Sequence, residues 1–136
     1  ASQIFGSQCI VGSIEAKNKG GSWEAYIDNG REKTGKDVID WATSLEQLGA
    51  GEIIITSVDR DGTQQGFDIE LVKEISNVIT IPLIVSGGAG SLLHIEELCK
   101  MTKFHGVAVG SLLHYRKSDI RSIKNTMVNN NLRVRA

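Results

Sequence analysis

Four short runs of mostly apolar, largely β-branched residues are spaced along the chain and predict four strands. They are Gln8–Ile14, Ile53–Val58, Leu83–Val85 and Val107–Val109. Because apolarity in these runs is continuous rather than alternating, they are typical of strands that are buried on both faces, as in a parallel sheet.

Between and after these runs, apolar residues recur at three- and four-residue spacings, which predicts helices. The predicted helices are Asp37–Leu48, Ile69–Ile75, Leu92–Met101 and Asp119–Val128. Asp68 and Ser91 stand where the second and third of these helices need an N-cap. A strand followed by a helix, four times over, indicates an α/β protein with a parallel sheet.

The long segment Lys17–Thr34 lies between the first predicted strand and the first predicted helix. Trp23, Ala25 and Ile27 alternate within it, and the sequence DNG that follows favours a tight turn. These features predict a small β excursion in the first strand-to-helix loop. Four units cannot close a barrel, so an open sheet would keep two free edges and an uncovered inner face.

Composition narrows the class of protein. The chain has 136 residues, which favours a single domain spanning residues 1–136. Its 15 Lys and Arg nearly balance its 16 Asp and Glu, so there is no basic stripe for nucleic acid. No apolar run approaches the ~20 residues of a membrane span, and no signal peptide is present. The first residues, ASQIFGSQ, lack an initiating Met and are expected to come from the middle of a longer chain.

Cysteine and histidine usage predicts neither a disulfide framework nor a metal site. Cys9 and Cys99 each lie in an apolar run, which favours buried free thiols in a reducing cytoplasm. His94 is expected on the solvent-facing side of its helix. The three histidines have no partners at metal-ligand spacing.

The stretch TSVDRDGTQQGFD leaves the second predicted strand and carries candidate chemistry. Side chains alternate along that strand, so Glu52 and Thr56 lie on the same face. In a barrel this face would point inwards, with Glu52 at one end of the barrel and Thr56 at the other. Asp61 is a candidate hydrogen-bond acceptor for substrate, or an acid or base, and Gly62 permits a tight turn. The alternative is that Asp61 only stabilises an Asx-type turn.

Small residues follow the third and fourth predicted strands and indicate an anion site. The third strand runs into SGGAG, from Ser86 to Gly90, directly before a helix. Backbone N–H groups in such a loop favour an anion. The fourth strand ends in Gly110 and Ser111. Two neighbouring loops of this kind predict a phosphate site more specifically than either alone, although a plain turn remains the alternative.

Glu15, within SIEAK, is a further candidate because it closes the first predicted strand. A carboxylate at the carboxyl end of a parallel strand lies where catalytic groups sit in (β/α)8 barrels, and it would suit a general acid. The alternative is an ion pair with Lys17 or Arg60.

Taken in order, the stretches FGSQCIVGSIEAK, GAGEIIITSVDRDGTQQGFD, IPLIVSGGAG and VAVGSLLHYR resemble the second half of the cyclase subunit of imidazole glycerol phosphate synthase. The resemblance implies the C-terminal half, strands five to eight, of a (β/α)8 TIM barrel of about 250 residues. That family converts a ribulose-phosphate aminoimidazole intermediate and ammonia into imidazole glycerol phosphate and an aminoimidazole carboxamide ribotide. The ammonia comes from a glutaminase subunit docked at the amino ends of the strands.

The resemblance also implies roles for particular residues. Thr56, Asp61 and Ser86 match residues near the substrate. Glu15 occupies the position of an aspartate that does acid or base work, and it is longer by one methylene; a displacement of about 1 Å can cost roughly a hundredfold in rate. One phosphate site is expected from Gly62, Gly87, Gly88, Gly110 and Ser111. Glu52 matches one member of a charged ring that gates ammonia entry. No cofactor or metal is implied.

Two other functions fit the same residues. Glu15 would suit a paralogous subunit that uses ammonia to amidate a sugar nucleotide in surface-glycan synthesis. An inactive half-barrel that assembles with itself is the third possibility. The expected partners are a glutaminase subunit, a phosphorylated small-molecule substrate, and either the missing first half or a second copy of the chain. The expected location is the cytoplasm.

Overall fold

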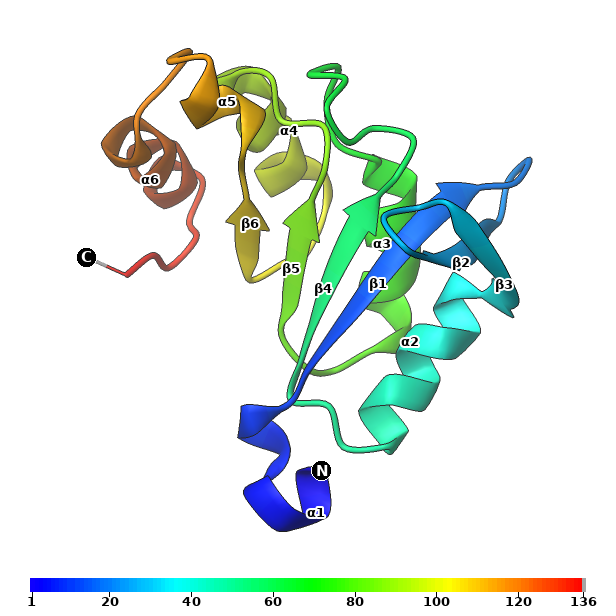
Figure 1. Cartoon of the computed structure of the whole chain (residues 1–136). Helices are drawn as coiled ribbons and strands as arrows, with labels where there is room; N and C mark the ends of the chain where they lie inside the picture. Colours follow the sequence, from blue (N-terminus) through cyan, green and yellow to red (C-terminus); the bar gives the residue numbers. More distant parts are fainter. Residues whose placement is uncertain (136) are drawn as a thin grey trace.

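The computed structural model describes residues 1–135 and contains one six-stranded sheet (Figure 1). The strand order is β3-β2-β1-β4-β5-β6. The strands are β1 (Val11–Asn18), β2 (Trp23–Ile27), β3 (Glu32–Asp37), β4 (Glu52–Ser57), β5 (Leu83–Ser86) and β6 (Gly106–Ala108). Neighbours among β1, β4, β5 and β6 are parallel, whereas β2 and β3 form an antiparallel hairpin attached to β1. The α/β class and the β excursion are therefore confirmed.

Helices follow the strands as the apolar spacing predicts. They are α1 (Ser2–Phe5), α2 (Val38–Gln47), α3 (Ile69–Val78), α4 (Leu92–Met101), α5 (Ser111–His114) and α6 (Ile120–Asn129), with a 3-10 turn at Ser7–Cys9. Asp37, Asp68 and Asp119 cap α2, α3 and α6 by accepting first-turn N–H groups. Ser91 occupies the N-cap position of α4, but its side chain makes no capping hydrogen bond.

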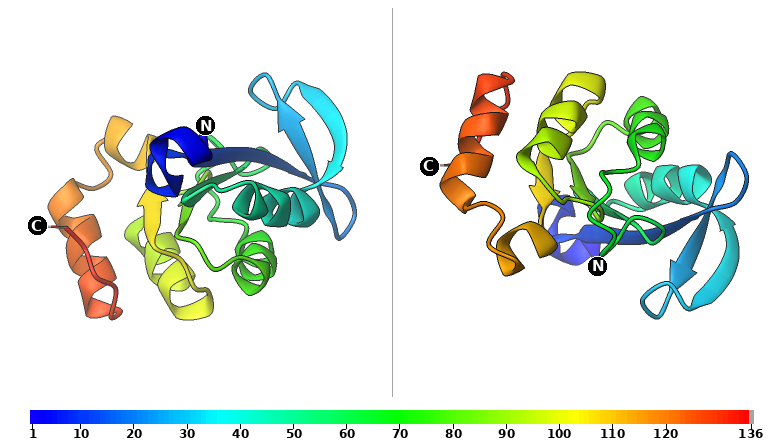
Figure 2. Two further views of the ribbon diagram at one scale, coloured as in Figure 1. Left: turned by 90° about the horizontal axis from the view of Figure 1, so that it is seen from below. Right: turned by 90° about the horizontal axis from the view of Figure 1, so that it is seen from above.

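One face of the sheet is covered by α2, α3 and α4 (Figure 2). The side chains that point from the strands into this layer are buried, namely Ile14, Ala16, Ile53, Ile55, Leu83 and Val85. They form one core with Val38 and Ala42 of α2, Leu71, Val72 and Ile75 of α3, and Ile95 and Leu98 of α4. Burial of these apolar groups is the main stabilising contribution.

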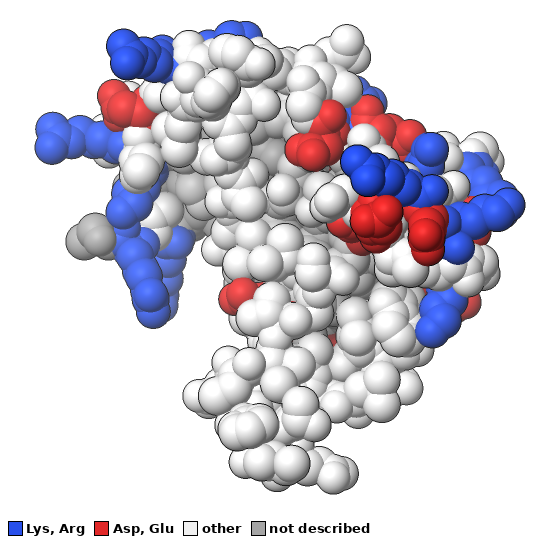
Figure 3. All heavy atoms as spheres, viewed as in Figure 1, with Lys and Arg blue, Asp and Glu red and all other residues white. Residues whose placement is uncertain are grey.

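The opposite face of the sheet is open, which corrects the prediction of strands buried on both faces. Burial alternates along β4 and β5, and Ile54 and Ile84 on the open face remain partly exposed. Helices α2, α3 and α4 lie on the other side of the sheet, so the apolar side chains on this face have no helical layer over them (Figure 2). This surface carries few charged side chains (Figure 3).

The first strand begins and ends later than predicted. The segment Ser7–Cys9 is a 3-10 turn, and β1 continues to Asn18. The reason is the excursion: Glu15 to Asn18 pair antiparallel with β2 while Val11 to Ala16 pair parallel with β4. Cys9 is exposed rather than buried, because it lies in the turn outside the sheet, and Cys99 is partly buried.

Two carboxylates connect elements that are distant in sequence. Asp68 accepts the indole N–H of Trp23 at 2.9 Å with one oxygen and the N–H of Leu71 at 3.1 Å with the other. Glu46 at the end of α2 accepts the hydroxyl and N–H of Thr80, which, with the N–H of Ile81, hold the pKa of Glu46 below its usual value.

Candidate functional site

Three predicted site residues stand side by side on the open face of the sheet. Glu15 of β1 is paired with Thr56 of β4, and Thr56 is paired with Ser86 of β5. Ala108 of β6 continues the same row. Paired residues of neighbouring strands point to the same face, so the row spans all four parallel strands near their carboxyl ends. The strand register therefore places these three side chains on one face and at one level.

A pocket of about 220 Å³ lies beside this row, where the loops after β4, β5 and β6 converge. It is lined by Asp61, Gly62, Ser86, Gly87, Gly88, Ala89, Ala108, Gly110 and Ser111. The pocket thus brings together every residue that was predicted to bind phosphate, together with Asp61 and Ser86. Ala89 and Ala108 were missed; Ala108 could have been found by extending the strand register one strand further.

The SGGAG loop is shaped by the neighbouring protein backbone. Gly87 and Gly88 have φ of 92° and 107°, which side-chain-bearing residues rarely adopt. The N–H of Gly66 donates to the carbonyl of Gly88 at 2.8 Å, and a Cβ on Gly88 would lie 2.1 Å from the Gly66 carbonyl oxygen. Gly88 is therefore required by the loop that presses on it, and not only by the approach of a ligand oxygen.

Backbone donors remain free in that loop. Within residues 1–135, no hydrogen bond uses the N–H of Gly88 or Ala89. Both residues line the pocket, and α4 begins three residues after Ala89 in the sequence. Free N–H groups ahead of a ten-residue helix favour an anion such as phosphate.

Asp61 is held in place by its backbone while its carboxylate stays free. Its N–H donates to the Ser57 carbonyl at 2.9 Å, and Gly62 turns the chain with φ of 74°. No hydrogen bond or ion pair to the Asp61 carboxylate occurs among residues 1–135. The Asx-turn alternative is therefore wrong for Asp61. The neighbouring Asp59 has the structural role instead, since it accepts the N–H of Asn18 at 2.6 Å.

Glu15 is partly buried and is bound to the hairpin, not to a cation. Its Oε2 accepts the N–H of Gly30 at 2.7 Å. The turn Asp28-Asn29-Gly30 has left-handed φ values of 53°, 55° and 75°, which aim this N–H at the end of β1. The predicted ion pair with Lys17 or Arg60 is absent from the described residues. The Lys17 ammonium lies 5.2 Å from the centre of the Tyr26 ring instead.

Glu52 lies away from this row, at the amino end of β4. It borders a groove of about 720 Å³ between β6 and the C-terminal segment. The other lining residues are His105, Gly106, Val107, Val109, Leu113, Ile120, Ile123, Lys124, Met127, Arg133, Val134 and Arg135. Lys and Arg side chains gather on this side of the molecule, over α6 and the C-terminal segment (Figure 3). Glu52 thus lies at the amino ends of the parallel strands, at the edge of the sheet opposite the pocket.

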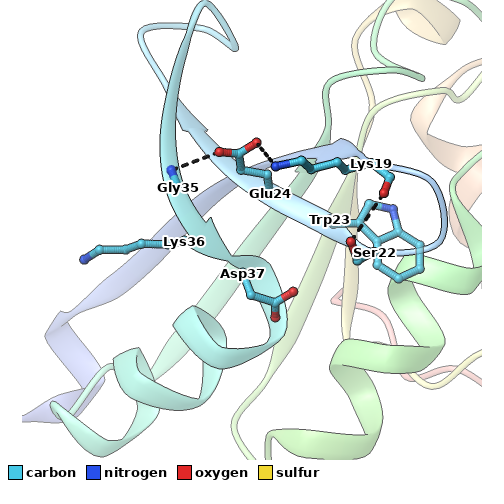
Figure 4. A pocket seen from close by; sticks show the side chains of 7 residues that line it. All are labelled: Lys19, Ser22, Trp23, Glu24, Gly35, Lys36 and Asp37. Carbon is cyan, nitrogen blue, oxygen red and sulfur yellow. Dashed lines mark hydrogen bonds and ion pairs between the residues drawn. The ribbon is translucent and has the colours of Figure 1, made fainter.

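A smaller pocket beside the hairpin has a structural explanation. It measures about 160 Å³, and Glu24 lies at its wall (Figure 4). The buried Glu24 carboxylate accepts the N–H of Gly35 at 3.0 Å and pairs with the Lys19 ammonium at 3.4 Å. These contacts join the two strands of the hairpin and so fix its position on β1.

The described part of the chain shows neither a metal-binding cluster nor a membrane-spanning helix. No group of three or more His, Cys, Asp or Glu side chains there could hold a metal ion. None of the helices in residues 1–135 is both long enough and apolar enough to cross a membrane.

Comparisons with known proteins show the family to which the chain belongs. The profile of a family described as histidine biosynthesis protein matches residues 1–119. Imidazole glycerol phosphate synthase subunit HisF of Prochlorococcus marinus strain AS9601 is 46% identical over 138 residues, covering 99% of this chain and 54% of the relative. The same subunit of strain NATL1A is 48% identical over 134 residues, covering 96% of this chain and 52% of the relative. The chain spans about half the length of these curated relatives. It belongs to the histidine biosynthesis protein family.

Proposed function

We propose that this chain is the C-terminal half of a (β/α)8 barrel that carries out the cyclase reaction of imidazole glycerol phosphate synthase. The parallel strands β1, β4, β5 and β6 then correspond to barrel strands five to eight. The apolar side chains on the open face, Ile54 and Ile84, support this assignment because a closed barrel would bury them. Relatives about twice as long as this chain leave room for the other four strands.

The convergence of free donors and a free carboxylate in one pocket carries the proposal. The N–H groups of Gly88 and Ala89, with those of Gly110 and Ser111 from the next loop, bind one phosphate group of the substrate. Asp61 accepts a hydrogen bond from a substrate hydroxyl or transfers a proton at the same site. Thr56 and Ser86 line the floor beside it.

Glu15 is proposed as the acid or base contributed by this half. It stands two strands away from Ser86 in the same row, so a substrate anchored in the pocket extends over it. The hydrogen bond from Gly30 keeps the longer side chain turned towards the hairpin. The second catalytic carboxylate and the second phosphate site come from the missing half.

Two partners follow from the proposed reaction. A glutaminase subunit docks at the amino ends of the strands and delivers ammonia, and Glu52 forms part of the gate there. The groove of about 720 Å³ beside the free edge of β6 receives the missing half or a second copy of this chain. We expect self-association of the isolated chain, and a monodisperse monomer in light scattering would contradict it. The expected location is the cytoplasm.

Binding of the reaction product tests the pocket directly. Imidazole glycerol phosphate added to the ¹⁵N-labelled chain is expected to shift the amide resonances of Asp61, Gly88 and Ser111. Amides of the hairpin strand β3 serve as the internal control because they lie at the far edge of the sheet. If the pocket amides do not move at millimolar product, this assignment of the site is wrong.

Amidation of a sugar nucleotide in surface-glycan synthesis is the second candidate, and Glu15 is the observation that favours it. The cyclase family has an aspartate there, and a carboxylate that reaches the hairpin is displaced from the substrate. In a reconstituted barrel, Glu15→Asp raises cyclase turnover if the cyclase assignment is correct. Transfer of ammonia to a sugar nucleotide, with no imidazole glycerol phosphate from either variant, would favour the glycan pathway. An inactive, self-assembled half-barrel would show neither activity.

A further inference from the structure

His94 holds the loop that forms one wall of the pocket. It is the third residue of α4, and its Nδ1 accepts the N–H of Gly90 at 3.1 Å. In a capping box, the side chain of the third helical residue accepts a backbone N–H at the N-cap. Here the accepted N–H lies one residue earlier, and Ser91 at the N-cap makes no side-chain bond. His94 therefore takes the place of the usual cap. The prediction that His94 only faces solvent is wrong, because its ring binds the backbone of the loop before α4.

The N–H of Gly90 depends on this acceptor. Gly87, Gly88, Ala89 and Gly90 are all buried. A Cβ on Gly90 would lie 2.1 Å from the carbonyl oxygen of Gln64, so the loop after β4 presses directly on this residue. A buried N–H without an acceptor is costly, and the loop would rearrange to find one.

The imidazole ring also reaches the loop after β4. Its Cδ2 lies 3.5 Å from the position that a Cβ on Gly66 would occupy, and the N–H of Gly66 donates to Gly88. His94 thus bonds to one of the loops that line the pocket and lies beside a second.

We propose that His94 is a positioning residue for the anion pocket. By accepting the Gly90 N–H, it fixes the SGGAG loop so that the N–H groups of Gly88 and Ala89 face the pocket. It acts through Gly90 and does not touch the ligand. This inference rests on the phosphate site proposed above, and it adds a residue outside the pocket lining to that site.

The test compares two substitutions of similar size in the ¹⁵N-labelled chain, with inorganic phosphate as the probe. His94→Asn keeps an acceptor near the position of Nδ1, whereas His94→Leu removes it. We expect His94→Asn to bind phosphate nearly as well as the unchanged chain. His94→Leu is expected to bind it roughly tenfold more weakly and to shift the Gly90 amide proton upfield. His94→Ala is a second variant without a side-chain acceptor, in case His94→Leu does not fold.

The outcomes separate this inference from the site on which it rests. If the unchanged chain binds no phosphate in the pocket, the phosphate site is wrong and the role of His94 falls with it. If the unchanged chain binds phosphate and a folded His94→Leu or His94→Ala variant binds it equally well, the site stands and His94 is not a positioning residue. Equal weakening in the Asn and apolar variants would also overturn the proposal, because the acceptor would not matter.

Discussion

Gly110 offers a way to block the proposed phosphate pocket without disturbing the fold. It lines the pocket, a Cβ built on it meets no atom within 4 Å, and its φ of −111° is open to any residue. Gly88 also lines the pocket, but its φ of 107° disfavours a side chain, and a Cβ there would collide with the loop after β4. We therefore expect Gly110→Asp to fold normally and to lose affinity for phosphate.

The size of this loss follows from Coulomb's law. A carboxylate about 4 Å from a phosphate charge costs about 1 kcal/mol in bulk water and about 4 kcal/mol at an effective dielectric constant of about 20. Gly110 is exposed, so the lower part of this range applies. A penalty of about 1–2 kcal/mol weakens binding roughly 5- to 30-fold.

The assay is a titration of inorganic phosphate followed by amide chemical shifts, with Gly110→Ala as the matched control. The alanine variant is expected to bind phosphate within about threefold of the unchanged chain, since a methyl group adds no charge. Raising the salt concentration should reduce the difference between the two variants. Equal affinity of Gly110→Asp and Gly110→Ala at low salt would refute the reasoning.

Three further predictions concern stability and reactivity. The lowered pKa of folded Glu46 means that its carboxylate stabilises the fold above about pH 4.5, and that this stabilisation is lost as the pH falls through the folded pKa. Glu46→Gln should therefore lower the free energy of unfolding by at most about 1 kcal/mol at neutral pH, and this difference should vanish in acid. A difference between the two proteins that does not change with pH would contradict this. Asp68→Ala should lower the unfolding free energy by about 2–4 kcal/mol in urea titrations followed by tryptophan fluorescence, since a helix cap and an indole acceptor are both lost; a change below about 1 kcal/mol would refute this. Cys9 should react with a thiol reagent faster than Cys99, because Cys9 is exposed and burial raises the pKa of Cys99. Cys9→Ser should remove the fast phase of the reaction; if a fast phase remains, Cys99 is the more reactive thiol.

Features set by neighbouring residues in the sequence could be predicted well. The apolar spacing placed α4 at Leu92–Met101 without error, and Asp68 was identified as an N-cap. The loops after the strands were predicted to meet at one edge, and the pocket confirms that they do. Parallel strands force this result, because their carboxyl ends share one edge of the sheet.

Features that depend on distant contacts were missed. The extension of β1 to Asn18 requires the hairpin to pair back onto it. Binding of Glu15 by Gly30 requires a left-handed turn fifteen residues away. The role of His94 depends on two loops pressing together, which its place on a helix does not reveal. In each case, the contact joins residues that come together only when the chain folds, so the local sequence pattern does not reveal it.

Complementation with an amino-terminal half tests the proposed function most directly. This chain would be mixed with the amino-terminal half of the HisF subunit from Prochlorococcus marinus, and turnover of the ribulose-phosphate aminoimidazole substrate with ammonium salts would be measured. We expect no turnover by either half alone, and imidazole glycerol phosphate from the mixture, in greater amount with Glu15→Asp. Turnover by the isolated chain, or none by a stably associated mixture even with Glu15→Asp, would contradict the assignment of this chain as half of a cyclase active site.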